Sequence, residues 1–194
     1  MLDPGLRPIA PGLRMAGAAC TVSCRGDFLG VLEALRHAEA GEVLVVDAGA
    51  GHLAVAGELF ATEARRKGLA GIVVDGAVRD VATIRVLGLP VYARSICPAA
   101  GTVSALGAFN EPIRCGGVEI VQGDIVIGDD DGIVVLTEDE LRELLPIAEE
   151  IQARESDALA RMAAGQSLFD LINFDEHLAA LEAGRPSRFR FTGQ

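Results

Sequence analysis

Aromatic residues are scarce in this sequence, which contains no tryptophan and one tyrosine; aromatics make up 4% of its 194 residues. Proteins that bind single-stranded nucleic acids usually stack the bases on aromatic side chains, and no such platform is evident here. Acidic residues outnumber basic ones, and the resulting net charge of -11 would repel a phosphate backbone. The composition therefore predicts no nucleic-acid partner.

Long apolar runs are missing as well. No stretch approaches the roughly 20 apolar residues that span a bilayer, and the N-terminal MLDPGLRPIAPGLR lacks the apolar core of a secretion signal. We therefore expect no membrane association and a cytoplasmic location.

Cysteine and histidine are too few and too scattered for two common kinds of site. The four cysteines do not suggest a disulfide framework and are expected to be small, reduced core residues. The three histidines show no zinc-ligand spacing, so no metal role is assigned to them. These residues are Cys20, Cys24, Cys97, Cys115, His37, His52 and His177.

The sequence does contain enough apolar residues, 50%, to build the core of one ordinary domain. Buried strands alternate with helices through the first half, which is typical of an α/β protein. Asp27 is expected to cap the first helix, and Asp75 to end its strand and order the turn that follows. The expected strands are 16–24, 42–47, 71–75 and 90–93, and the expected helices are 28–38, 57–67 and 81–88.

From residue 113 onward the pattern changes to short β segments separated by glycine-containing turns, which predicts antiparallel hairpins. Asp129, Asp130 and Asp131 are expected to form a turn, because the glutamate that a calcium loop needs later in the chain is missing. A capping box at 137–140 then opens a long amphipathic helix to about Ala164. We predict an α/β domain over 1–137 and a helical extension of it over 138–194.

A glycine-rich segment, Gly49-Ala50-Gly51-His52-Leu53-Ala54, satisfies the loose dinucleotide-binding pattern G-x-G-x-x-A. It follows the second expected strand rather than the first, and the later hairpins do not suit a doubly wound sheet. Nucleotide binding is therefore the weaker interpretation of this segment.

A second polar group joins Glu58, at the start of a helix, to Arg79 and Asp80, which follow the strand 71–75. Helix N-termini bind anions, and loops beyond the carboxyl ends of sheet strands are where α/β proteins place ligands. On spacing alone, however, an adjacent Arg and Asp are more often a solvated surface pair.

The residues around this group resemble a known family. The segment GEL…GLAGIVVDGAVRD, followed by GLPVYAR and GDIVIGDDDGIVVL, is similar to the class II pyruvate aldolases. Those enzymes cleave 4-hydroxy-4-methyl-2-oxoglutarate and 4-carboxy-4-hydroxy-2-oxoadipate, and they share a fold with the regulator of ribonuclease activity A. The resemblance covers about residues 9 to 170. It implies a compact domain like the swivelling β/β/α domains, in a homotrimer or homohexamer.

The resemblance also implies roles for individual residues. Asp80 would ligate Mg²⁺ or Mn²⁺, and Arg79 would lie against the ketone and enolate oxygen of pyruvate, the product of the small 2-oxo acid substrate. The backbone amides of Leu59 and Phe60, after Gly57, would hold the pyruvate carboxylate. Glu58 would orient a metal-bound water.

The sequence departs from the family pattern in two places. Most of these aldolases and decarboxylases have Asp where this chain has Glu58, and an N-terminal helix that most members carry before the segment 7–12 is missing here. A further acid from a neighbouring subunit contributes in the family, and Glu155 matches it best. The predicted function is a metal-dependent lyase that cleaves 4-hydroxy-2-oxo diacids or decarboxylates oxaloacetate. The alternative is a non-catalytic regulator of ribonuclease activity or a 2-oxo acid binding protein.

Overall fold

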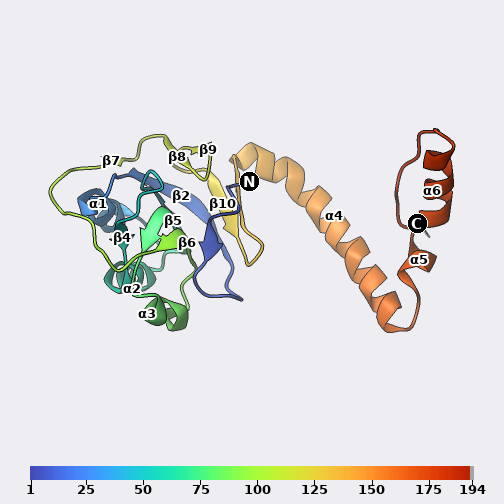
Figure 1. Cartoon of the computed structure of the whole chain (residues 1–194), viewed down its shortest axis with the longest axis horizontal. Coiled ribbons are helices and arrows are strands. Elements are labelled where there is room, and N and C mark those ends of the chain that lie inside the picture. The colour runs from blue at the N-terminus through green and yellow to red at the C-terminus, as the bar shows by residue number, and fades with distance from the viewer. Residues whose placement is uncertain (193–194) are drawn as a thin grey trace. The chain divides into compact units, whose positions relative to one another are not determined.

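A computed structural model of the chain describes residues 1–192. They form two units, one from Met1 to Leu141 and the other from Arg142 onward. The strands are β1 Arg7–Pro8, β2 Met15–Ser23, β3 Val43–Asp47, β4 Ala54–Ala56, β5 Gly71–Val78, β6 Val91–Ile96, β7 Ala108–Phe109, β8 Ile113–Cys115, β9 Val118–Ile120, β10 Ile125–Gly128 and β11 Ile133–Leu136. The helices are α1 Leu29–His37, α2 Glu58–Lys67, α3 Val81–Leu87, α4 Glu138–Ala163, α5 Leu168–Leu171 and α6 Phe174–Glu182 (Figure 1).

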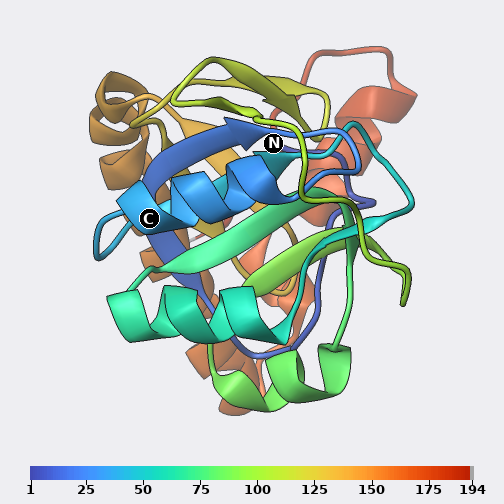
Figure 2. The same ribbon diagram turned by 90° about the vertical axis from the view of Figure 1, so that its left-hand side faces the viewer.

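A mixed sheet forms the centre of the first unit, in the order β1-β6-β5-β3-β2-β10-β11. The pairs β2–β3, β3–β5 and β5–β6 are parallel, whereas β10 joins β2 and β11 in antiparallel fashion. In Figure 2, α1, α2 and α3 lie side by side across one face of the sheet. This arrangement confirms the predicted α/β fold.

The sheet is buried on both faces, as its continuous apolar strands predicted. Alternate residues of β3 belong to different clusters: Leu44 and Val46 pack under the helices, whereas Val43 and Val45 face the opposite side. That opposite side is covered by the β8–β9 hairpin and by the N-terminal segment, which contributes Leu2 and Leu6. The sheet therefore separates two apolar cores.

The N-terminal segment is held by residues that come late in the sequence. The Leu2 N–H donates to the carbonyl of Ile133 at 2.9 Å, and the Asp3 N–H donates to Gly116 at 2.9 Å. Arg94 Nε donates to Asp75 at 2.5 Å, and its Nη1 lies 3.5 Å from Asp3. Asp75 also accepts the Gly116 N–H at 2.6 Å, so its carboxylate ties β5 to this segment.

Two expectations about β5 and its carboxylate were wrong. The strand does not end at Asp75 but continues to Val78, passing a register shift against β6 between Val74 and Ala77. Asp75 therefore does not order the turn before Arg79; it is buried and paired with Arg94. The predicted cap of α1 also needs adjustment, because Phe28 occupies the N-cap position and Asp27 accepts the Leu29 N–H from one residue earlier.

Other local predictions are confirmed. Gly68 ends α2 in the left-handed conformation, and Thr137 and Glu140 form the reciprocal hydrogen bonds of a capping box at the start of α4. Asp129 and Asp131 lie in the tight turn between β10 and β11.

Three cysteines match their prediction as core residues, since Cys20, Cys24 and Cys115 are buried and free. Cys97 does not, because it follows the end of β6 and is only half-buried. Burial raises the pKa of the Cys20 and Cys24 thiols to about 12, so these groups stay protonated.

The second unit is helical. Its α5 begins with a capping box formed by Ser167 and Asp170, and Asn173 binds the backbone of Arg188 and Arg190, which fixes the chain after α6. Within the described residues, no helix combines the length and apolar character needed to cross a membrane.

Candidate functional site

Parallel pairing of β4 and β5 brings two distant polar segments together. Ala56 at the end of β4 is in register with Val78 at the end of β5, and the Arg79 N–H donates to the Ala56 carbonyl at 3.1 Å. The next residues of each segment are Gly57 and Glu58 on one side and Arg79 and Asp80 on the other. The carboxyl ends of parallel strands thus build the site, as is usual for α/β proteins.

Gly57 lets these two segments touch. A Cβ at this position would lie 2.5 Å from Asp80 Oδ2 and 3.0 Å from Arg79 Cγ, both closer than van der Waals contact allows. Asp80 itself has a φ of 59°, in the left-handed region that Asp and Asn tolerate better than most residues. The site therefore depends on glycine at position 57, which has no side chain, and on the left-handed backbone of Asp80.

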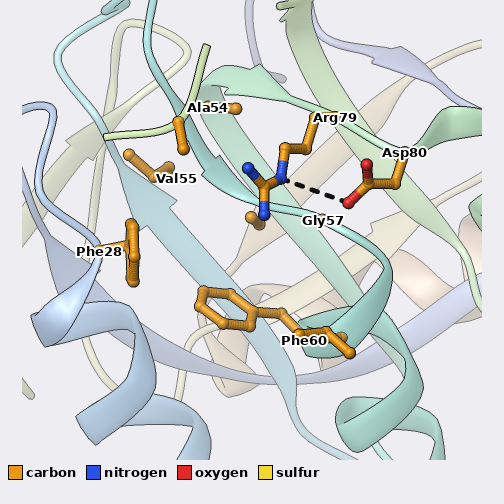
Figure 3. Close-up of a pocket in the computed structure, with 10 residues that line it drawn as sticks. Phe28, Ala54, Val55, Gly57, Phe60, Arg79 and Asp80 are labelled. Carbon is orange, nitrogen blue, oxygen red and sulfur yellow. Dashed lines mark ion pairs between the residues drawn. The ribbon is translucent and has the colours of Figure 1, made fainter. Parts of the chain in front are cut away.

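The carboxylate of Asp80 is bound on one oxygen and open on the other. Oδ2 accepts the Glu58 N–H at 3.3 Å and lies 3.3 Å from Arg79 Nε (Figure 3). Within residues 1–192 no group donates a hydrogen bond to Oδ1. The Asp80 side chain is 36% exposed, so Oδ1 can reach a ligand from solvent.

A small pocket of about 130 Å³ opens beside this pair. The guanidinium of Arg79 points into it, between Val55 and Phe60 (Figure 3). Phe28 and Phe60 meet edge to face with ring centroids 5.8 Å apart. The pocket is lined by Phe28, Ala54, Val55, Ala56, Gly57, Leu59, Phe60, Arg79, Asp80 and Ala100. A mostly apolar pocket with a few polar groups that can fix the orientation of a ligand is typical of a binding site for a small molecule.

The start of α2 adds backbone donors to the pocket. The first intrahelical hydrogen bond runs from the Ala61 N–H to the Gly57 carbonyl, so helix geometry leaves the N–H groups of Leu59 and Phe60 without a carbonyl partner inside α2. Both residues line the pocket, and the helix dipole favours negative charge there.

Of the predicted site residues, the structure therefore gathers Gly57, Leu59, Phe60, Arg79 and Asp80 around one pocket. Glu58 is different: its backbone contacts Asp80, but its Oε2 accepts a hydrogen bond from Thr83 Oγ1 on α3 at 2.8 Å. Glu155 lies on α4 in the second unit. Its part in the site stays a prediction.

Phe28, the residues of β4 and Ala100 were not predicted as site residues. They reach the pocket through long-range contacts that no local pattern indicates. The glycine-rich segment 49–54 leads into β4 rather than a helix, so the helix that a dinucleotide site needs does not begin there.

The donor set suits a hard divalent ion held by one carboxylate. Within residues 1–192, no three His, Cys, Asp or Glu side chains gather into a metal cage. Mg²⁺ commonly binds through one or two carboxylates and keeps several waters, which agrees with the single open oxygen of Asp80 at the pocket. Asp80 is thus the residue that would hold such an ion.

A family model described as RraA-like, Aldolase/RraA, matches residues 1–135. The chain belongs to the RraA-like family. Among RraA-like relatives, a protein of Halalkalibacterium halodurans named "Putative 4-hydroxy-4-methyl-2-oxoglutarate aldolase" is 38% identical over 154 residues, which cover 78% of this chain and 73% of that protein. The family resemblance inferred from the sequence is confirmed.

Solved RraA structures share the fold. The RNA-processing inhibitor RraA from Thermus thermophilus is 32% identical, with a TM-score of 0.67 over 71% of this chain and 84% of that one. RraAS2 of Streptomyces coelicolor, described as an unusual member of the RNase ES inhibitor RraA protein family, is 30% identical, with a TM-score of 0.71 over 83% of each chain. These three relatives carry names of two kinds, aldolase and inhibitor of RNA processing.

Proposed function

We propose that this RraA-like protein is a divalent-metal-dependent lyase that releases pyruvate from 4-hydroxy-2-oxo diacids by retro-aldol cleavage and decarboxylates oxaloacetate. The observation that carries the proposal is the adjacent Arg79 and Asp80 at the edge of a small pocket that also receives the N-terminus of α2. Both reactions leave the same pyruvate enolate, so one site can serve both substrates.

The residues of the pocket have separate tasks in this proposal. The Leu59 and Phe60 N–H groups bind the carboxylate next to the ketone, and the Arg79 guanidinium lies against the ketone oxygen, where negative charge develops. Asp80 would hold Mg²⁺ or Mn²⁺, which when bound would supply Lewis-acid polarisation of the 2-oxo acid. The apolar wall excludes water from the remaining side.

Both reactions break the C3–C4 bond of the substrate and leave the same enolate. In the aldol substrate the C3–C4 bond breaks, its electron pair stays on C3, and the C4 hydroxyl loses its proton as C4 becomes a carbonyl. In oxaloacetate the same bond breaks with loss of carbon dioxide. Protonation of C3 then gives pyruvate. In the aldol reaction Glu58, acting through a water, would hold the hydroxyl proton on Oε1, the oxygen that does not contact Thr83, until C3 takes it. In the decarboxylation, which releases no hydroxyl proton, the proton for C3 comes from solvent.

A mechanism through an imine intermediate would need a lysine amine in the pocket, and no lysine lies there. Lys67 is the one lysine of the sequence, and it lies at the far end of α2 from Glu58. Its Nζ donates to the carbonyls of Leu35 and Arg36 at 2.8 and 2.7 Å. Stabilisation of the enolate by cations is therefore the chemistry that the site supports.

The test is pyruvate release from oxaloacetate and from 4-hydroxy-4-methyl-2-oxoglutarate, with added Mg²⁺ and after chelation. We expect turnover that depends on the metal and that Asp80→Ala abolishes, while Asp131→Ala, in the exposed β10–β11 turn, keeps it. Turnover that survives both chelation and Asp80→Ala would remove Asp80 as the ligand.

The second candidate is a regulator of RNA processing, favoured by the names of the Thermus and Streptomyces relatives. An inhibition assay with a ribonuclease of the E type separates the two. If the protein is a regulator, the wild type and Asp80→Ala should inhibit the ribonuclease equally well, and neither should release pyruvate.

A further inference from the structure

One wall of the pocket is built from a segment without regular secondary structure. Residues 99–105, here called the strap, lie between β4 and the chain that precedes α1. Ala54 bonds the strap on both sides, donating to Ala99 at 2.8 Å and accepting from Gly101 at 2.9 Å. The Thr102 N–H donates to Gly26 and its carbonyl accepts from Phe28, both at 2.9 Å. The strap thus joins two segments that each line the pocket.

Asp27 holds the strap with its side chain. Its Oδ2 accepts from Thr102 Oγ1 at 2.6 Å, from the Ser104 N–H at 2.7 Å, from Ser104 Oγ at 3.3 Å and from the Ala105 N–H at 3.1 Å. Its Oδ1 accepts the Leu29 N–H at 3.0 Å. Asp27 is 5% exposed, so these donors replace water around its charge.

This set of partners requires a carboxylate. The Leu29, Ser104 and Ala105 partners are backbone N–H groups, which can only donate, and they approach both oxygens. An Asn at this position would offer one accepting oxygen and would set its NH₂ group against an N–H on the other side. Charge-assisted hydrogen bonds of this kind are also stronger than neutral ones.

The hydrogen bonds between Asp27 and the strap, here called the clamp, act on the pocket through residues next to them. Phe28 follows Asp27 directly, Ala100 lies on the strap, and Ala54 is bonded to the strap; all three line the pocket. Gly101 packs so closely on the Gly26 carbonyl that a Cβ there would lie 2.4 Å from its oxygen. A strap that loosened would therefore move this wall of the pocket.

We propose that Asp27 is a positioning residue for substrate binding, which fixes the wall formed by Phe28, Ala54 and Ala100 by clamping the strap. The proposal rests on the lyase function proposed above. Asp27 touches no reacting atom, and Arg79 and Asp80 are held by other contacts, on Gly57 and β4. Loss of the clamp should therefore weaken substrate binding more than it slows the chemical step.

The test compares Asp27→Asn with Thr102→Val, which removes one hydrogen bond of the clamp without changing the shape of the side chain. In the metal-loaded protein we expect both substitutions to raise KM for oxaloacetate, Asp27→Asn by about tenfold, with kcat within about threefold of wild type. Thr102→Ser, which keeps the hydroxyl, should restore KM. Asp124→Asn is the matched control, because Asp124 accepts a backbone N–H in a turn outside the pocket.

Hydrogen–deuterium exchange supplies a readout that needs no activity. Amides of residues 99–105 should exchange faster in both variants, whereas those of β3 should not change. Unchanged exchange of the strap would overturn the clamp, and faster exchange with an unchanged KM would overturn its link to the pocket. If the wild-type protein releases no pyruvate, the lyase function fails while the exchange experiment still decides on the clamp. Thr102→Val keeps the test valid if Asp27→Asn does not fold.

Discussion

At the scale of single residues, Gly57 has no side chain, and this allows Asp80 to lie against the start of α2. Gly57→Ala would place a methyl group 2.5 Å from Asp80 Oδ2, so the carboxylate and Arg79 must move. We expect kcat/KM for pyruvate release to fall by about a hundredfold, the usual effect of a misplacement near 1 Å. The melting temperature should also fall, because the position is the N-cap of α2 and alanine is a poorer N-cap than glycine, but the variant should stay folded at the assay temperature. Unchanged activity would mean that the Asp80 position does not matter.

The charge of Asp27 makes a second residue-scale prediction. Hydrogen bonds from the Ser104 N–H, the Thr102 hydroxyl and the Leu29 and Ala105 N–H groups hold the pKa of Asp27 far below its usual 3.8. A group with a lowered folded-state pKa stabilises the fold above its unfolded pKa, and this contribution disappears as the pH falls toward the folded value. In urea titrations, the stability difference between wild type and Asp27→Asn should be constant above about pH 5 and should shrink below 3.8. A difference that grows on acidification contradicts this.

At the scale of secondary structure, the pair of Asp75 and Arg94 fastens β5 and β6 to the N-terminal segment. Asp75→Ala would leave Arg94 and the Gly116 N–H without their main partner. We expect the free energy of unfolding to fall by about 3 kcal/mol, as for other buried pairs that lose one member. Glu63→Ala is the control, because Glu63 makes the same kind of bond to Arg66 at the surface. It should cost less than about 1 kcal/mol.

Elements with a strong local signal could be predicted from the sequence. Strand β3 is a continuous apolar run, and α2 has Glu58 at its start and Gly68 at its end, so each element was found to within a residue or two. The extension of β5 to Val78 was missed because it depends on the register shift against β6. Strands as short as β4 carry no periodicity of their own.

The site residues that are adjacent in the sequence could be predicted. Those that packing brings to the pocket from other segments could not. Arg79 and Asp80 follow a buried strand in sequence, and the family resemblance singled them out. Phe28 and Ala100 reach the pocket only because the strap crosses between β4 and α1. The partner of Asp75 was missed for the same reason, since Arg94 and Gly116 come from other elements.

At the scale of the whole molecule, α4 of the second unit carries an apolar stripe. Leu144, Ile147 and Ile151 follow helical spacing and are 44%, 52% and 51% exposed. The homotrimer or homohexamer expected from the family would bury such a stripe. We predict that the double substitution Ile147→Glu and Ile151→Glu lowers the mass measured by sedimentation, whereas Ala153→Glu, on the opposite face, does not. An unchanged mass in the double variant would exclude this stripe from the subunit contact.

The hydrogen bond from Leu2 to Ile133 also bears on how the protein is made. Leu2 can meet its partner Ile133 only after about 130 more residues have been translated. Until then, the side of the sheet that Leu2 and Leu6 cover is incomplete, so the α/β unit should reach its native state late in synthesis. A nascent chain stalled before β11 should be sensitive to protease, and one stalled well beyond it should be resistant.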